Sequence, residues 1–238
     1  MTKLEEDCGS AVQNQYRPLL ELAIREELGT RPGNSDWLTY QIDPISHSPS
    51  LLFHYPLCVS GGLTYIATSV KMEFGSLTDQ RPVGMYRIKP MLADSIPASF
   101  DDFLSDVVAL ELERTFWEKA TILHAEHHRP EKQGIRDRLA RHYADFAALW
   151  RHPGHVKASR DHELLARVAA HKSRFFSSTW AQYEKAVPGT LRLLPPEFRI
   201  PAIANDYAKM REMFWNEPLR FEDILALLRE AEQEINHP

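Results

Sequence analysis

Lys119 and Asp145 are the two residues whose types and positions most clearly suggest a chemical role. Both lie in the stretch from Leu110 to Trp150, which reads as two helices joined by a polar loop. Three apolar residues of the first helix recur at helical spacing: Leu112, Phe116 and Leu123. Lys119 falls in the middle of this stripe, so its ammonium must reach solvent or meet a carboxylate, because a buried unpaired charge is costly. We therefore predict that Lys119 points toward Asp145 or Glu73, as part of either a functional site or a salt bridge at the edge of the core.

Basic side chains accompany Asp145 on the second helix. The apolar stripe of this helix comprises Leu139, Tyr143, Phe146 and Trp150. Arg138, Arg141 and His142 lie beside that stripe, and the planar fork of arginine suits phosphate oxygens. The three residues are therefore candidate phosphate contacts, although arginines on such a helix also occur as a solvated face. We expect Trp150, like Trp117 on the first helix, to be buried.

Arg114 and Glu118 form a second charged pair, on the first helix. Their helical positions predict that both lie on its outer face. There they would make a surface contact between residues four apart, worth a few tenths of a kcal/mol.

Four histidines in the same region indicate an alternative chemistry, a zinc or other metal hydrolase. They are His124, His127, His128 and His142. His124 and His128 are four residues apart and share a helix face, as zinc ligands on a helix often do. The sequence contains no HExxH motif to support that alternative, and no GxSxG motif to support a serine hydrolase.

The composition is that of a globular protein with a sizeable core. The chain has 238 residues, of which 43% are hydrophobic, and a net charge of −5, which does not indicate a nucleic-acid binder. No apolar run is long enough to span a membrane, and the N-terminus lacks a signal-peptide pattern. Two cysteines, Cys8 and Cys58, are too few for a disulfide framework. We therefore expect a cytoplasmic protein.

The pattern along the chain predicts an α+β fold. Residues 1–10 are polar and expected to be frayed, and a helix is expected over Tyr16–Leu28. Strands are expected at Trp37–Ile42, Leu51–Tyr55, Thr64–Phe74, Met85–Ile88 and Asp106–Leu110. Further helices are expected at Leu112–His127, Ile135–Trp150, Asp161–Lys172, Ser177–Val187, Ile203–Phe214 and Phe221–Ile235. This order predicts a small mixed N-terminal sheet followed by a helical bundle, with the boundary between Ala98 and Glu111.

Several blocks of the sequence resemble the AbiEii/AbiGii toxin family of nucleotidyltransferases, which are relatives of the DNA polymerase β superfamily. The central blocks are ERTFWEKATILH and RHYADFAAL, at 113–124 and 141–149. Earlier blocks are FHYP and VKMEFGS, and later ones are HKSRFFSSTWAQYEKAVPGTLRLLP, DYAKM, MFWNEP and EIN. The resemblance extends from about Trp37 to Asn236. It implies that residues 1–105 are a partial nucleotidyltransferase-like α/β region, with the sheet as a remnant of that core, and that residues 106–238 are a helical domain.

The resemblance also implies roles for individual residues. Lys119 matches the family's lysine, which contacts the nucleotide phosphates, and Asp145 matches its later aspartate. Glu73 fits the third metal carboxylate of the family and would help to hold Mg²⁺, although it also reads as a solvent-exposed strand carboxylate. The implied substrate is an NTP, the implied acceptor is an RNA such as tRNA, and a winged-helix antitoxin is an expected genetic neighbour.

Two family motifs are not found at their expected places in this sequence. They are a glycine-rich GGT-type motif and, shortly after it, an acidic pair of the D-x-D kind. Because one glutamate cannot hold two Mg²⁺ ions, we expect little or no nucleotidyltransferase activity from the 238-residue chain alone. An in-frame segment carrying both motifs upstream of Met1 would restore the first two carboxylates. The alternative is a non-catalytic remnant or binding module that retains the family fold.

Overall fold

The computed structural model describes residues 3–43, 48–56, 65–96 and 104–237. These residues confirm the predicted α+β class. The chain divides into two compact units, residues 1–78 and 79–238. The strands that we expected after residue 82 are grouped with the helices of the second unit, whereas the expected boundary lay between Ala98 and Glu111. Cys58 lies outside the described residues.

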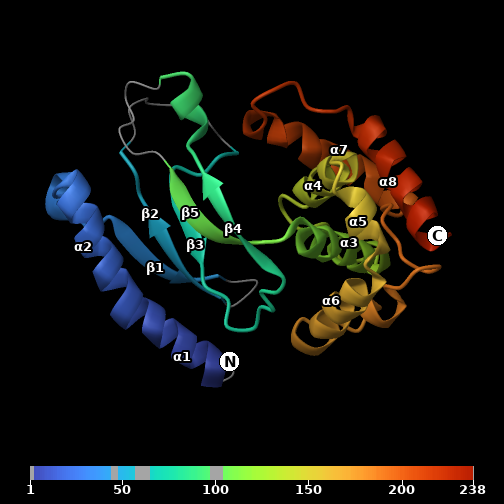
Figure 1. The fold of residues 1–238 in the computed structure, drawn as a ribbon, viewed down its shortest axis with the longest axis horizontal. Coiled ribbons are helices and arrows are strands. Elements are labelled where there is room, and N and C mark those ends of the chain that lie inside the picture. The colour runs from blue at the N-terminus through green and yellow to red at the C-terminus, as the bar shows by residue number, and fades with distance from the viewer. Residues whose placement is uncertain (1–2, 44–47, 57–64, 97–103, 238) are drawn as a thin grey trace. The chain divides into compact units, whose positions relative to one another are not determined.

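The first unit packs a long helical segment against a three-stranded sheet (Figure 1). Its elements are α1 (Lys3–Ala11), the π-helical turn η1 (Val12–Tyr16), α2 (Arg17–Leu28), the 3₁₀ turn η2 (Pro32–Asn34), β1 (Leu38–Ile42), β2 (Pro49–Phe53) and β3 (Val70–Glu73). The strand order is β1-β2-β3, and both pairings are antiparallel, so the expected mixed sheet is wrong for these strands. Val12, Leu38 and Leu51 form the centre of the core.

Two expectations for this unit are wrong. Residues 3–10 are helical rather than frayed, because Val12 and Cys8 pack against the sheet and give the helix an apolar anchor. The strand expected over Thr64–Phe74 is short. It comprises only Val70–Glu73, where β3 pairs with β2, while Thr64 lies outside the described residues.

The second unit combines a β-hairpin with a helical bundle. The hairpin pairs β4 (Val83–Ile88) with β5 (Ser105–Leu110) in antiparallel register. The helices are α3 (Leu112–His128), α4 (Ala140–Arg151), α5 (His155–Arg160), α6 (His162–Phe175), α7 (Ile200–Lys209) and α8 (Phe221–Asn236). Short 3₁₀ turns complete it: η3 (Met91–Asp94), η5 (Tyr183–Lys185), η6 (Glu197–Arg199) and η7 (Met210–Met213). Helix α3 packs against α4, α5 and α6, and α4 packs against α7 and α8 (Figure 1). None of the described helices is long and apolar enough to span a membrane.

The helices of this unit depart from the expected ones at the start of α4, at α5 and over Ser177–Val187. Helix α4 begins at Ala140 rather than Ile135, because Arg138 has a positive φ of 61° and Asp206 of α7 accepts the Ala140 N–H at 2.8 Å. Helix α5 was not expected. No α-helix forms over Ser177–Val187. Gln182 has a left-handed φ of 47° there, which interrupts any helix before the turn η5.

The apolar stripes of the two helices meet between α3 and α4. The rings of Phe116 and Phe146 lie with centroids 4.9 Å apart, and the Trp150 ring lies 6.3 Å from that of Phe116. Trp117 and Trp150 are buried, as predicted. This aromatic contact fixes the relative rotation of α3 and α4, and therefore the direction in which their polar faces point.

Replacement of Trp150 by alanine is expected to lower the stability of the helical unit by about 3–5 kcal/mol, because truncating a buried tryptophan leaves a cavity. Trp150 is 2% exposed, and its indole N–H donates to Glu230 at 3.2 Å. Urea unfolding followed by circular dichroism measures the change. Trp215→Ala is the matched control, because Trp215 is 72% exposed and its loss should shift the midpoint little. A Trp150→Ala midpoint equal to that of the control would contradict the assigned packing.

Candidate functional site

Lys119 and Asp145 meet where the polar faces of α3 and α4 adjoin. The ammonium Nζ of Lys119 donates to Oδ2 of Asp145 at 2.6 Å, which confirms the predicted contact. The side chain of Lys119 is 23% exposed and that of Asp145 is 47% exposed. The ion pair is therefore reachable from solvent. A negatively charged ligand could approach the ammonium from the solvent side.

His142 completes this cluster from the same side as Asp145. Its Nδ1 lies 3.3 Å from the Lys119 Nζ. Burial, together with the nearby cations Lys119 and Arg141, lowers the pKa of His142 to about 3. The imidazole is consequently neutral at physiological pH and offers no positive charge to a phosphate.

The two arginines predicted to contact phosphate occupy different positions. Arg141 is exposed on α4 and close enough to His142 to lower its pKa. Arg138 is exposed just before α4, and its backbone N–H donates to Asp206 at 3.3 Å. The structure thus brings Lys119, His142 and Asp145 into one cluster, with Arg141 on its border.

Glu73 belongs to the first unit. It ends β3, its side chain is 55% exposed, and its carboxylate pairs with Lys71 at 2.6 Å. The same ammonium also pairs with Asp43 at 2.7 Å. Lys71 therefore neutralises part of the negative charge that a metal ion would need at this carboxylate.

A network of charges around the buried guanidinium of Arg114 holds the turn of α3 that carries Lys119. Arg114, which is 1% exposed, donates to Glu118 at 3.0 Å, to Asp79 at 2.7 Å and to the carbonyl of Arg81 at 3.1 Å. The expectation that Arg114 and Glu118 form a surface pair is wrong. Residues 79–81, which lead into β4, cover this face of α3 and replace solvent as the partner of the guanidinium.

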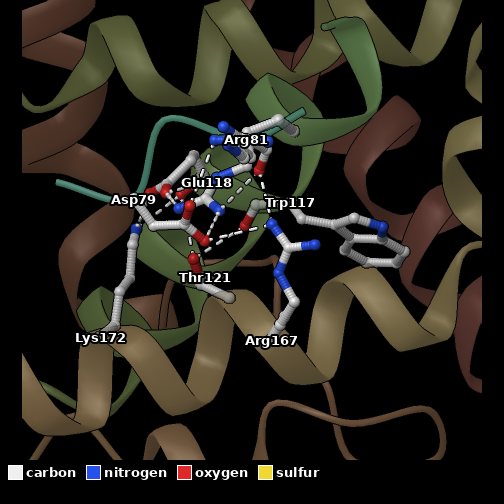
Figure 2. Close-up of polar contacts among 8 residues, drawn as sticks. Asp79, Arg81, Trp117, Glu118, Thr121, Arg167 and Lys172 are labelled. Carbon is white, nitrogen blue, oxygen red and sulfur yellow. Dashed lines mark hydrogen bonds and ion pairs between the residues drawn. The ribbon is translucent and has the colours of Figure 1, made fainter. Parts of the chain in front are cut away.

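Helix α6 closes the network from the other side. Lys172 and Arg167 reach from α6 toward Glu118 and Asp79 (Figure 2). The Nζ of Lys172 lies 2.9 Å from both the carboxylate and the backbone carbonyl of Glu118, and Arg167 donates to the Arg81 carbonyl at 2.8 Å. Burial alone would raise the pKa of Glu118, but Lys172 and Arg114 outweigh it and lower that pKa.

Sequence reasoning did not identify this network. Asp79, Arg167 and Lys172 lie in segments far from α3 along the chain, so the helical spacing within α3 carried no signal of them. The four-residue spacing of Arg114 and Glu118 was the one visible feature. In the structure, Glu118, the residue before Lys119, is fixed by Arg114 on one side and Lys172 on the other.

The alternative of a histidine metal site finds no support at His124. This side chain is fully buried, its Nε2 lies 3.0 Å from the carbonyl of Gln182, and its Nδ1 accepts the N–H of Arg192 at 3.0 Å. The accepting role of Nδ1 places the proton on Nε2, which donates to Gln182. Both nitrogens are thus engaged with the backbone of the irregular segment between α6 and η6, and neither is directed to a metal.

Acid is expected to destabilise the helical unit through His124. Burial is the main cause that lowers its pKa from 6.5 to about 4. Well above pH 6.5 the imidazole is neutral in the folded and unfolded chains, and the free energy of unfolding is not reduced by His124. As the pH falls from 6.5 to 4, the unfolded chain binds a proton at this residue that the folded chain does not, and stability is lost. By pH 5 the expected loss is about 2 kcal/mol.

Urea unfolding at pH 7.5 and pH 5, on the wild type and on His124→Asn, measures this loss. The wild type should lose about 2 kcal/mol more than the variant between the two pH values, because other titrating groups contribute equally to both. Equal pH dependence of the two proteins would show that His124 is not the responsible group.

The described residues do not by themselves complete a Mg²⁺ site. Among residues 3–43, 48–56, 65–96 and 104–237, no three His, Cys, Asp or Glu side chains gather in a way that could hold a metal ion. Mg²⁺ requires octahedral ligation by oxygen, and Glu73 supplies one carboxylate that is already paired with Lys71. A divalent ion at this protein would need further carboxylates.

Comparison with known proteins identifies the family of this chain. The family model described as "Nucleotidyl transferase AbiEii toxin, Type IV TA system" matches residues 3–227. That range includes Lys119, His142, Asp145 and the network below them. No curated protein and no solved structure shows a significant match to the chain.

Proposed function

Because the chain belongs to the AbiEii family of nucleotidyl transferase toxins of type IV toxin–antitoxin systems, we propose that it takes part in transferring a nucleotide from an NTP to an RNA acceptor such as tRNA. In that reaction an acceptor oxygen bonds to the α-phosphorus of the NTP, the bond to the β-phosphate breaks, and pyrophosphate leaves. The family implies an NTP substrate and an antitoxin partner. We further propose an RNA acceptor, dependence on Mg²⁺, a winged-helix antitoxin and a cytoplasmic location.

The contact between Lys119 and Asp145 is the observation that carries this proposal. Nucleotidyl transfer requires little covalent chemistry from the protein and depends on positioning and on neutralising phosphate charge. Lys119 provides a partly exposed ammonium on a helix that is fixed from below by the Arg114 network. We assign Lys119 to the phosphates of the NTP and Asp145 to holding the ammonium in position for them.

Other residues have more limited roles in the proposal. Arg141, exposed beside the cluster, would contact phosphate together with Arg138. Glu73 would contribute one oxygen ligand to Mg²⁺, which would shield phosphate charge when bound. The remaining ligands would have to come from the D-x-D carboxylates of the family pattern.

A second candidate function is an NTP-binding module without catalysis. It is favoured by the sequence, in which the glycine-rich and D-x-D motifs are not found, and by the lack of a three-residue metal-binding group among the described residues. The two candidates share the phosphate contact and differ in the transfer of the nucleotide.

Parallel measurements of binding and transfer test both candidates. Calorimetry with non-hydrolysable NTP analogues measures binding, and incubation of the protein with α-labelled NTPs, bulk tRNA and Mg²⁺ or EDTA measures transfer. A longer form of the protein is included if the coding DNA continues upstream of Met1 with an in-frame D-x-D segment. Mg²⁺-dependent labelling of RNA in any form supports the transferase, and binding without labelling in every form supports the binding module. The lack of both binding and labelling would overturn both.

A further inference from the structure

The hydrogen bond between Lys119 and His142 defines which nitrogen of the imidazole carries the proton. The ammonium of lysine has three donors and no acceptor. The Nδ1 of His142, 3.3 Å from the Lys119 Nζ, can therefore bond to it only as an acceptor. This requires a neutral ring with its proton on Nε2.

Helix α4 holds His142 and Asp145 in a fixed relation to each other. They are three residues apart and so lie on the same side of the helix. Tyr143 and Phe146, on the adjoining face, are buried, and Asp206 accepts an N–H of the first turn of α4. The two acceptors thus approach Lys119 as one rigid element, and burial among cations keeps the pKa of His142 near 3.

We propose that His142 is a positioning residue, which holds the Lys119 ammonium as a neutral acceptor and does not itself contact phosphate. A second carboxylate at this position would weaken the attraction of Lys119 for an anion, and a second cation would compete with the ammonium for the same phosphate oxygens. A neutral acceptor fixes the direction of the ammonium without changing its charge. Two of its three N–H bonds then donate to His142 and Asp145, and the third can donate to a phosphate oxygen.

The protonation of His142 is tested directly on the wild-type protein. A long-range ¹H–¹⁵N NMR spectrum between pH 6 and 8 should show a bare Nδ1 and a protonated Nε2 for His142. A signal from a protonated Nδ1, or from an imidazolium, would overturn the proposal. This measurement needs neither a nucleotide nor activity.

The effect on Lys119 is tested with two variants of His142. His142→Asn places an amide oxygen near the position of Nδ1 and keeps an acceptor, whereas His142→Phe removes it. Spectra of the lysine ¹⁵N ammonium groups should show an ordered Lys119 signal in the wild type and in His142→Asn, and a loss of that order in His142→Phe. An ordered Lys119 signal in folded His142→Phe would overturn the proposal, and circular dichroism verifies the folding.

Comparing the NTP affinities of the wild type and the two variants tests the role of His142 in binding. This test rests on the proposed function, whereas the spectra do not. The expected affinity for a non-hydrolysable NTP falls on the order of tenfold in His142→Phe and is restored in His142→Asn. Equal affinities of both variants and the wild type, with the Lys119 signal disordered in His142→Phe, would overturn the role in binding. A wild type that binds no NTP would contradict the proposed function and leave the spectroscopic result to decide the position of Lys119.

Discussion

Replacement of Lys119 by methionine is expected to reduce NTP binding, and any nucleotidyl transfer, by on the order of 100-fold or more, because it removes the charge that we propose contacts the phosphates. The fold should persist. Methionine retains an apolar side chain of similar length in the stripe, and the partner Asp145 is about half exposed, so water can solvate it once the ammonium is gone. Exposed ion pairs of this kind stabilise proteins by at most about 1 kcal/mol.

Calorimetry with an NTP analogue measures the binding of Lys119→Met, and thermal unfolding measures its stability. Lys132→Met is the matched control, since it removes an exposed lysine from the loop between α3 and α4. The control should bind like the wild type. Loss of folding in Lys119→Met would favour the interpretation of the ion pair as a purely structural contact, and unchanged binding in a folded variant would exclude Lys119 as the phosphate contact.

The position of Lys119 could be predicted from the sequence because it depends on the residue patterns of two consecutive helices. The apolar stripes of α3 and α4 define which faces pack together, and a lysine within one stripe needs a partner on the neighbouring helix. Phe116, Phe146 and Trp150 do pack as this argument requires. Asp145 is the residue before Phe146, about 100° from it around the helix, so it lies at the solvent-side edge of the contact, next to the ammonium.

The same helical projection failed for Arg114 because its partners are remote in sequence. Asp79 lies 35 residues away, and Lys172 reaches Glu118 across 54 residues. A spacing rule can identify the outer face of one helix, but it cannot show that another segment covers that face. Because Arg114 is charged, we expected it to face solvent. Its guanidinium instead donates to carboxylates and a carbonyl inside the unit.

A similar cause explains the helix wrongly expected over Ser177–Val187. Side chains of distant helices bind the backbone of this segment and of the residues that follow it. His124 of α3 binds the carbonyl of Gln182, and Glu232 of α8 accepts the N–H of Leu193 at 2.6 Å. These bonds satisfy polar backbone groups that a helix would otherwise satisfy. The order of this segment is therefore tertiary in origin and was not predictable from its own residues.

Replacement of Arg114 by methionine is expected to destabilise the helical unit by about 3 kcal/mol, because removing the buried guanidinium leaves its carboxylate partners less well compensated. Glu118 would keep Lys172, and Asp79 would keep Arg167, so the expected loss lies at the lower end of the range for buried pairs. The carbonyl of Arg81 would also lose one of its donors. Urea unfolding followed by circular dichroism measures the loss of stability.

Arg87→Met is the matched control for Arg114→Met. Arg87 also pairs with an aspartate, Asp106, at 2.8 Å, but both side chains are more than half exposed on the β4–β5 hairpin. Its removal should cost at most about 1 kcal/mol. Hydrogen exchange adds a local readout, since Arg114→Met should speed exchange in the first turns of α3, where the network anchors the helix. Equal stability losses in the two variants would show that burial of Arg114 adds nothing to its ion pairs. The network would then not be what holds the turn of Lys119 in place.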